Sequence, residues 1–385
     1  MKSGNGILSS YGTTIFEVVS GLAREHGAVN LGQGAPEGME PADVVARAAQ
    51  AILDGPNQYP PLMGTPGLRR AVAAHEKRFY GLDVDWESEV MVTSGATGAL
   101  ADALFGLIEE GDEIILLEPL YDSYLPIIRR AGGVPRLVRL APPDWTLPRD
   151  RLAAAFSPCT KAILLNSPAN PCGKVYTEDE LDFIARLVRD HDAYAICDEV
   201  YEHLVFDGRK HIPLMTRPGM RDRCVRIASA GKIFSVTGWK IGMLVAAPDL
   251  LRPIIKAHQF LTFTVPPNFQ TAVAYGLEKE DGYFTTLIQD MQARRDRLAA
   301  GLAGVGFRVL PCGGSYFLTA DIGALGNADD DVAFCRRMTI EAGVAAVPVS
   351  AFHTTGEVNR FVRFCFAKSD ATLTEALARL NKYFG

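Results

Sequence analysis

Between about Glu89 and Ala246, short runs of strand-forming residues alternate with segments patterned as helices. Several runs, such as residues 162–165, are continuously apolar. Strands have this pattern when both faces of their sheet are covered, as in most parallel sheets. The pattern predicts an α/β fold with a mostly parallel sheet between helices. Predicted strands span residues 90–93, 113–117, 134–140, 161–166, 194–198, 225–229 and 241–246, and predicted helices span 98–110, 124–131 and 177–191, with another opening near Pro148.

The length of the chain favours two domains. It has 385 residues, which exceeds the size that a single hydrophobic core usually supports. Residues 285–303 are patterned as a long helix leaving the sheet unit, and the residues from Phe307 onward mix strands and helices on a smaller scale. We therefore expect a large domain over residues 41–284 and a smaller α+β domain over 285–385, which residues 1–40 join.

The net charge of the chain indicates which classes of binding partner to expect, and its cysteines indicate the cellular compartment. Lysine and arginine number 39 against 45 acidic residues, a net charge of −6. This balance argues against nucleic acid and against a polybasic membrane surface. The seven cysteines are scattered without a C-x-x-C pair, and the N-terminus lacks the apolar core of a signal peptide. We expect a cytoplasmic protein with small-molecule substrates and neither a nucleic-acid nor a membrane partner.

Several common chemistries find no support. Gly32 and Gly34 suggest a dinucleotide fingerprint, but Glu37 stands where the third glycine is required. The sequence contains no phosphate-binding G-x-x-x-x-G-K-[ST] loop, no H-E-x-x-H and no G-x-S-x-G. The seven histidines show no metal-ligand spacing, so no metal site is expected.

Lys232 follows a predicted strand directly, in a turn of small residues. A partly desolvated lysine near another cation, here Lys240, has a depressed pKa and can act as an amine nucleophile. Taken alone, however, Lys232 fits a surface loop better.

Asp198 ends the apolar run 194–198, where open α/β sheets bind ligands. It could hold a proton on a heteroaromatic nitrogen, with Tyr201 nearby as a phenol donor. A helix or turn cap is an equally good explanation for Asp198.

Three further segments are suggestive only in combination. Residues 94–98, Ser-Gly-Ala-Thr-Gly, connect a strand to a helix and would let a phosphate approach the helix N-terminus. Asn170 lies in a turn cluster after a buried strand and could present its amide to a ligand, although such a cluster is usually only a loop. Arg363 alternates with aromatic residues and is either a surface residue or a carboxylate-binding fork.

Together and in this order, these segments resemble the fold-type I pyridoxal-phosphate enzymes of the class I and II aminotransferases. The resemblance covers about residues 29–380 and is nearest to kynurenine and glutamine transaminases and bacterial methionine aminotransferases. It rests on the motifs N-L-G-Q-G-A-P (30–36), N-Q-Y-P (57–60), S-P-A-N-P-C-G-K (167–174), D-E-V-Y (198–201), S-A-G-K with G-W-K-I-G (229–242) and V-R-F-C-F (362–366).

The resemblance implies a role for each matching position. Lys232 would bond covalently to pyridoxal phosphate and move protons during catalysis. Asp198 would pair with the ring nitrogen, Asn170 and Tyr201 would bind the ring's 3′ oxygen, and Tyr121 would stack on the ring. Gly95, Ala96, Thr97, Ser229 and Lys240 would hold the phosphate. Tyr59 would reach the phosphate of a neighbouring subunit, which implies a homodimer. Arg363 and the backbone N–H of Gly34 would bind the substrate carboxylate.

The implied activity is a ping-pong transaminase that moves the amino group of a neutral or aromatic L-amino acid (methionine, glutamine, phenylalanine or kynurenine type) to a 2-oxo acid. A cysteine-S-conjugate β-lyase with the same cofactor remains an alternative, and a non-catalytic regulatory domain is a more remote one. Lys240 stands where relatives usually have arginine, so phosphate would meet a point charge instead of a fork. The segment after Pro36 also departs from the family pattern, which puts the substrate most in question.

Overall fold

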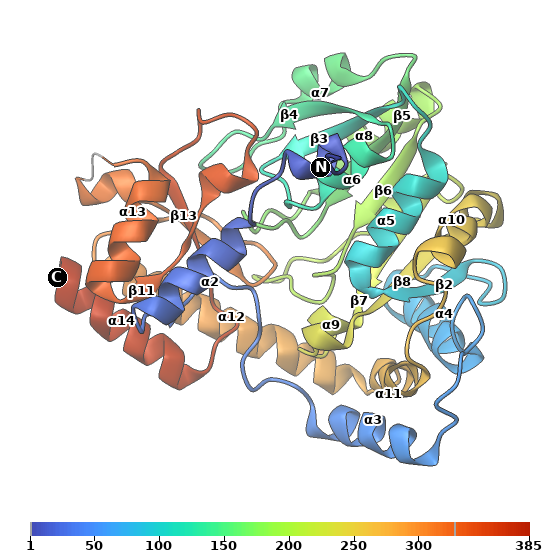
Figure 1. The fold of residues 1–385 in the computed structure, drawn as a ribbon, viewed down its shortest axis with the longest axis horizontal. Coiled ribbons are helices and arrows are strands. Elements are labelled where there is room, and N and C mark those ends of the chain that lie inside the picture. Colours follow the sequence, from blue (N-terminus) through green and yellow to red (C-terminus); the bar gives the residue numbers. More distant parts are fainter. Residues whose placement is uncertain (1, 327–328) are drawn as a thin grey trace.

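The computed structural model describes residues 2–326 and 329–385, and its centre is a mixed, mostly parallel sheet (Figure 1). Seven strands of the described residues form this sheet in the order β2-β8-β7-β6-β5-β3-β4. Only β8 runs against its neighbours there. This confirms the predicted α/β architecture. The strands are β2 (Val90–Ser94), β3 (Glu113–Glu118), β4 (Val134–Arg139), β5 (Thr160–Asn166), β6 (Tyr194–Asp198), β7 (Cys224–Ser229) and β8 (Ile241–Ala246).

Helices cover both faces of this sheet, which explains why its strands are continuously apolar. Ile114 and Leu116 of β3 face a core shared with α5 (Gly95–Leu107), α6 (Tyr124–Arg130) and α10 (Pro248–Leu261). Ile115 and Leu117 point the other way, into a core shared with α4, α7, α8 and α11. Successive side chains thus serve two cores. These four helices are α4 (Pro66–Tyr80), α7 (Arg149–Ala155), α8 (Glu178–Asp190) and α11 (Pro267–Leu277).

Two helix starts show how local chemistry sets the boundaries. The predicted capping box is present, because Thr177 accepts from the backbone N–H of Glu180 and Glu180 accepts from that of Thr177. Helix α5 begins at Gly95, three residues before the predicted start, directly after β2. Gly95 has φ +66°, a conformation that glycine adopts without strain, so strand and helix join without a loop.

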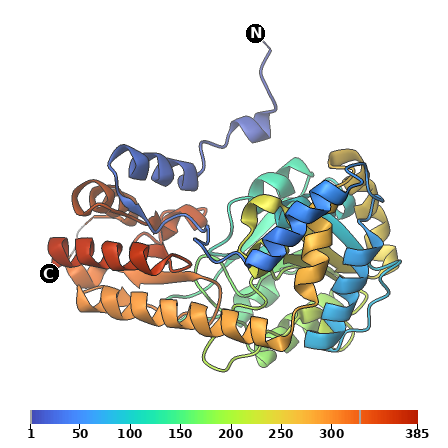
Figure 2. The same cartoon turned by 90° about the horizontal axis from the view of Figure 1, so that it is seen from below.

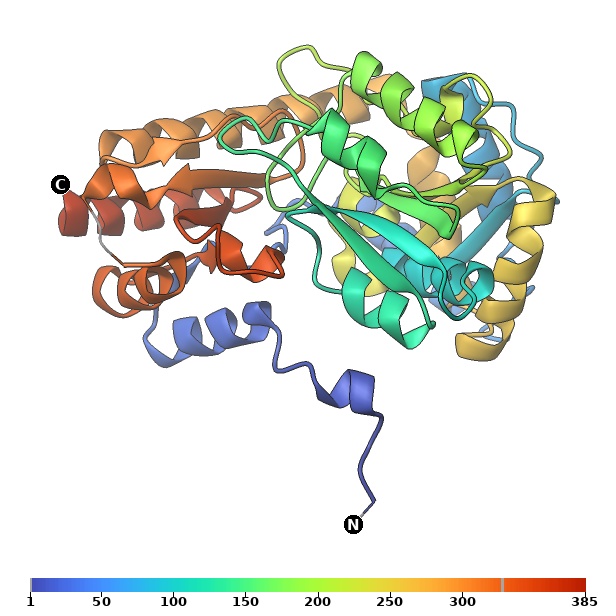
Figure 3. The same cartoon turned by 90° about the horizontal axis from the view of Figure 1, so that it is seen from above.

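A smaller unit of strands and helices lies beside the large sheet, at the end of the long helix α12 (Asp281–Gly304) (Figures 1 and 3). Strands β12, β13, β10 and β9 form an antiparallel sheet there, and α12 runs alongside α14 (Figure 2). None of the described helices has the length and apolar character needed to cross a membrane. The elements of this unit are β9 (Arg308–Val309), β10 (Phe317–Asp321), α13 (Asp331–Arg337), β11 (Val344–Ala345), β12 (Val347–Pro348), β13 (Phe361–Cys365) and α14 (Asp370–Phe384).

The N-terminal segment packs on this smaller unit. Strand β1 (Val29–Asn30) pairs with β11, and α2 (Ile15–Glu25) packs against Val347 and Phe352. These contacts support the expected joining of residues 1–40, while the domain limits stay a prediction. The chain around α1 (Gly6–Ser9) extends away from the body (Figures 2 and 3). The remaining elements are α3 (Ala42–Asp54), α9 (Ala230–Ile233) and the short helical turns Leu214–Thr216, Thr237–Trp239, Ile322–Leu325, Met338–Ala342 and Val349–Phe352.

Candidate active site

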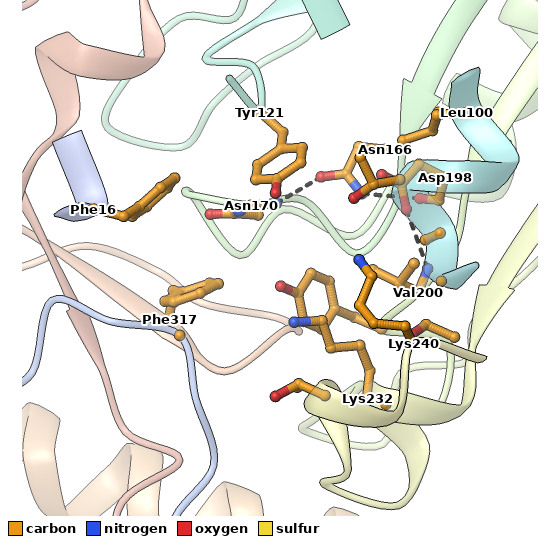
Figure 4. Close-up of a pocket in the computed structure, with 18 of the residues that line it drawn as sticks. Phe16, Leu100, Tyr121, Asn166, Asn170, Asp198, Val200, Lys232, Lys240 and Phe317 are labelled. Carbon is orange, nitrogen blue, oxygen red and sulfur yellow. Dashed lines mark hydrogen bonds between the residues drawn. The ribbon is translucent and has the colours of Figure 1, made fainter. Parts of the chain in front are cut away.

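A cavity of about 290 Å³ lies at the carboxyl ends of β5, β6 and β7 (Figure 4). Open α/β sheets bind their ligands at this edge. The N-terminal segment and the smaller sheet also contribute to its wall, through Phe16, Phe317 and Arg363. All the predicted site residues but one line this cavity. Those that line it are Gly34, Gly95, Ala96, Thr97, Tyr121, Asn170, Asp198, Tyr201, Ser229, Lys232, Lys240 and Arg363.

Tyr59 is the exception. This residue is 83% exposed, and its ring contacts Phe263 with ring centroids 5.5 Å apart. It therefore does not line the cavity of its own chain, and its assignment to a neighbouring subunit stays a prediction.

Lys232 reaches into the cavity from α9, which begins directly after β7. Its Nζ donates a 2.7 Å hydrogen bond to the hydroxyl of Tyr316. Burial lowers the pKa of Lys232 to about 8. An amine with this pKa can exist as ammonium or as free amine near neutral pH, which suits a nucleophile and a proton carrier.

Asp198 is the last residue of β6 and is buried. Its Oδ2 accepts a 2.6 Å hydrogen bond from the hydroxyl of Tyr124. Burial raises the pKa of Asp198, and the hydrogen bond from Tyr124 opposes that rise. A buried carboxylate of this kind gains most when it meets a cationic partner, such as a protonated ring nitrogen.

Arg363 places a buried guanidinium in the cavity wall with no carboxylate partner. It is 1% exposed, and Phe317 lies under its Cζ with the ring centroid 3.8 Å away. Its Nη1 donates to Oδ1 of Asn170 at 2.8 Å and its Nη2 to the carbonyl of Gly32 at 2.6 Å. Its Nε is buried without a partner, and none of the ion pairs among the described residues includes Arg363. Burial lowers the pKa of Arg363 to about 10, so it remains a cation at neutral pH. Such a group is a receptor for a carboxylate.

The N-terminus of α5 forms an anion cradle. Gly95, Ala96 and Thr97 line the cavity, and Ser94 makes no side-chain cap to this helix. The free N–H groups of a helix start attract phosphate. A Cβ on Gly95 would lie 3.1 Å from both Cε and Nζ of Lys240, so this lysine lies directly over the cradle. Ser229 completes the polar wall.

These features fit pyridoxal phosphate. The cradle suits its phosphate, Asp198 suits its ring nitrogen, and Lys232 suits its aldehyde. Gly34 lies close against Phe317, because a Cβ at this position would meet Cζ of Phe317 at 2.7 Å. Only glycine therefore lets this backbone pass beside the ring.

Sequence reasoning missed several residues of the site. Asn166 lines the cavity and donates through Nδ2 to the carbonyl of Asp198 at 2.9 Å. It ends an apolar strand, the same signal that singled out Asp198, so it could have been found. Phe16, Tyr124 and Tyr316 carry no comparable local signal.

Behind the cavity, the segment after β6 is held by a buried ionic cluster. Arg226 of β7 pairs with Glu76, Glu199 and Glu202, and its Nε donates to Glu199 at 2.8 Å. All four side chains are buried. Along residues 198–202 the roles alternate, because Asp198, Val200 and Tyr201 line the cavity while the two glutamates turn to Arg226.

Comparison with known proteins agrees with this geometry. The family described as aminotransferase class I and II matches residues 26–380. The chain is 45% identical to the probable N-succinyldiaminopimelate aminotransferase DapC of Mycobacterium tuberculosis, covering 97% of each chain. It is 38% identical to kynurenine–oxoglutarate transaminase 1 of Rattus norvegicus, covering 94% of this chain and 93% of that one. A solved Escherichia coli structure, identified as a methionine aminotransferase, superposes with a TM-score of 0.96 at 38% identity, over 99% and 100% of the two chains.

Proposed function

Because the chain belongs to the class I and II aminotransferases, whose members use pyridoxal phosphate, we propose that it moves the amino group of a neutral or aromatic L-amino acid to a 2-oxo acid. The observation that carries this proposal is the unpaired, buried guanidinium of Arg363 in the same cavity as Lys232.

The proposed cofactor contacts follow from the site. Gly95, Ala96, Thr97, Ser229 and Lys240 would hold the phosphate, Asp198 the ring nitrogen, Asn170 and Tyr201 the 3′ oxygen, and Tyr121 a face of the ring. Lys232 would hold the aldehyde carbon covalently. When bound, the cofactor supplies an electron sink for the electron pair left when the substrate's Cα–H bond breaks.

The chain's own residues supply geometry and proton transfer. Arg363 and the backbone N–H of Gly34 hold the substrate carboxylate, which fixes the direction of the Cα–H bond. Lys232 takes the proton from Cα and returns one later, a task suited to its pKa of about 8. The burial of Asp198 and its bond to Tyr124 keep that carboxylate fixed in place.

The cavity wall supports a substrate with a neutral side chain. Phe16 and Phe317 lie across the cavity from Asp198 (Figure 4). Among the described lining residues, the cations are Lys232, Lys240 and Arg363, and each has a role already. No lining cation of this part of the chain is then left for a second substrate carboxylate. The substrate in the name of the DapC relative carries further carboxylates, so we place it behind neutral and aromatic amino acids.

We also propose a homodimer with shared active sites. Tyr59 and Phe263 form an exposed apolar patch, and Phe260 and Leu261, close to Phe263 in sequence, are exposed as well. Such a patch favours burial against a protein surface. A second copy would cover it and receive Tyr59 at its phosphate cradle.

All seven cysteines are free thiols, six of them buried, in keeping with a reducing compartment, and we place the enzyme in the cytoplasm.

The test is to mix the purified holoenzyme with single amino acids and follow its visible absorption, then identify the products. Methionine, glutamine, phenylalanine and kynurenine are expected to bleach the band and yield a new amino acid once a 2-oxo acid is added. N-succinyldiaminopimelate as the sole effective donor would overturn the substrate class. Pyruvate with ammonia and thiol from cysteine conjugates, without transfer, would establish the β-lyase instead. Borohydride reduction and peptide mapping should place the cofactor on Lys232.

A further inference from the structure

We propose that Tyr316 is a positioning residue that holds the amino group of Lys232 and links its protonation to the position of the Gly34 backbone. The inference rests on the proposed function only in taking Lys232 as the catalytic lysine. The Tyr316 contacts themselves are given by the structure.

Tyr316 connects three segments that are far apart in sequence. Its hydroxyl lies 2.7 Å from Nζ of Lys232, in α9, and 2.7 Å from the carbonyl oxygen of Gly34, in the N-terminal segment. Tyr316 itself immediately precedes β10 and is fully buried. Its backbone is fixed as well, because its carbonyl accepts from the N–H of Phe366 at 3.0 Å.

The directions of these two bonds are determined by chemistry. A carbonyl only accepts, so the single phenol proton of Tyr316 is used by Gly34. Burial raises the pKa of Tyr316 well above its ordinary value, so that proton is retained. The lone pairs of the oxygen are left for Lys232. A hydroxyl that can only accept favours the ammonium form of Lys232 over the free amine.

This arrangement couples Lys232 to Gly34. If the Gly34 carbonyl moved away, the phenol proton of Tyr316 would be free to donate to the neutral amine of Lys232. The hydroxyl would then favour the free amine over the ammonium. Phe317 occupies the space beside Gly34 that any side chain would need, which keeps the carbonyl within reach of Tyr316. Gly34 is also the expected partner of the substrate carboxylate, so the substrate site and the catalytic amine share one hydrogen-bonded link.

Other groups also act on Lys232 and must be separated from Tyr316. Burial lowers its pKa most, Cys365 and Asp198 raise it, and Arg363 and Lys240 lower it. Tyr201 presents its ring 5.6 Å from Nζ. Tyr316 also forms a side-chain hydrogen bond with Tyr201, so Tyr316→Phe is compared with Tyr201→Phe, which removes that contact and keeps the one between Tyr316 and Lys232.

The experiment measures the protonation of Lys232 in the full-length chain after its cofactor has been removed. Trace acetylation across a pH series, quantified by mass spectrometry of the Lys232 peptide, gives the midpoint of its titration. In Tyr316→Phe the midpoint should fall by roughly half a unit to one unit, because a hydrogen bond to a charged group is lost. Backbone amides of residues 32–35 should also exchange hydrogen about tenfold faster.

Tyr176→Phe is the matched control, since Tyr176 is also buried and does not line the cavity. It should change neither the midpoint nor the exchange. An unchanged Lys232 midpoint in Tyr316→Phe would overturn the proposal. If Tyr316→Phe does not fold, 4-fluorophenylalanine incorporated at position 316 retains most of the shape but presents a fluorine, which accepts hydrogen bonds only weakly. It should lower the midpoint in the same direction, and no change there would also overturn the proposal.

Failure of this link and failure of the proposed function give different results. The titration uses the cofactor-free chain and needs no turnover. Cofactor mapped to another lysine would remove the proposed function while leaving the Tyr316 contact measurable. Cofactor mapped to Lys232 with an unchanged titration midpoint would remove only the Tyr316 role.

Discussion

The hydroxyl of Tyr124 donates a 2.6 Å hydrogen bond to Oδ2 of Asp198, joining the start of α6 to the end of β6. Both groups are buried. Burial raises the pKa of Asp198, and the hydrogen bond from Tyr124 opposes that rise. The stability of the ionised form of Asp198 therefore depends on this one hydroxyl more than that of an exposed carboxylate, which water would also solvate.

Tyr124→Phe should destabilise the cofactor-free chain in a pH-dependent way. Without the hydroxyl, the pKa of Asp198 rises further, so ionised Asp198 carries a larger penalty in the folded state. A carboxyl with a raised folded pKa loses stability as the pH rises through that pKa. Urea unfolding at pH 8 should show a loss of about 1–2 kcal/mol against the unmutated chain, and a smaller loss at pH 5. Tyr176→Phe should lose the same amount at both pH values. Equal losses for Tyr124→Phe at pH 5 and pH 8 would contradict the prediction.

Lys232→Met should stabilise the cofactor-free chain at neutral pH. The pKa of Lys232 falls from 10.5 to about 8 on folding, mainly through burial. Folding therefore disfavours its ammonium, and the penalty is fully present below about pH 8 and absent above the unfolded pKa. The free energy of unfolding of Lys232→Met should exceed that of the unmutated chain by up to about 3 kcal/mol at pH 7, with the gain vanishing toward pH 10.5.

Lys256→Met, at an exposed lysine, is the comparison variant and is measured at the same pH values. A Lys232→Met chain that is less stable at pH 7 than at pH 10.5, relative to the unmutated chain, would show that the ammonium is not disfavoured.

Arg363→Gln should raise the KM for amino-acid substrates by about two to three orders of magnitude, because a charge-assisted pair with the carboxylate is lost. The matched control is Arg360→Gln, three residues away. Arg360 is half-exposed and paired with Asp321 at 2.8 Å, outside the cavity wall. Steady-state kinetics should find a near-normal KM for that variant. An unchanged KM in Arg363→Gln would show that the carboxylate binds elsewhere.

Mixing two inactive variants tests the shared sites. A hybrid dimer contains one Lys232→Ala protomer and one Tyr59→Ala protomer. One of its sites receives Lys232 from the Tyr59→Ala chain and Tyr59 from the Lys232→Ala chain, so it is intact. The other site lacks both side chains. Random reassociation of equal amounts should therefore restore about a quarter of the full activity. Each variant reassociated with itself serves as the control. No recovery in a mixture shown to contain hybrids would mean that Tyr59 does not serve its partner's site.

Much of the large unit could be predicted from sequence because its signals are local. Continuously apolar runs such as β5 reflect burial on both faces, and a capping pair such as Thr177 and Glu180 lies within one turn. The start of α5 was placed too late, because the positive φ of Gly95 removes the loop that a change from strand to helix usually needs.

The residues of the candidate site also fall into two groups, those that a local sequence signal reveals and those that only the folded structure reveals. Asp198 and Lys232 could be found because each follows an apolar strand, and strand ends meet at one edge of a sheet. Tyr316 could not, because its contact with Lys232 joins residues 84 positions apart across two separately packed units. Tyr124 likewise meets Asp198 across 74 positions, through the packing of α6 on the sheet. No local spacing encodes such pairs.

The alternation of roles along residues 198–202 bears on how such an enzyme can evolve. Glu199 and Glu202 anchor this stretch from behind through Arg226, while Val200 and Tyr201 face the cavity. Substitutions at Val200 can therefore change the cavity wall without loosening the anchor. Replacing Arg226 would instead leave three buried glutamates without their cation, so selection for new activities should spare it.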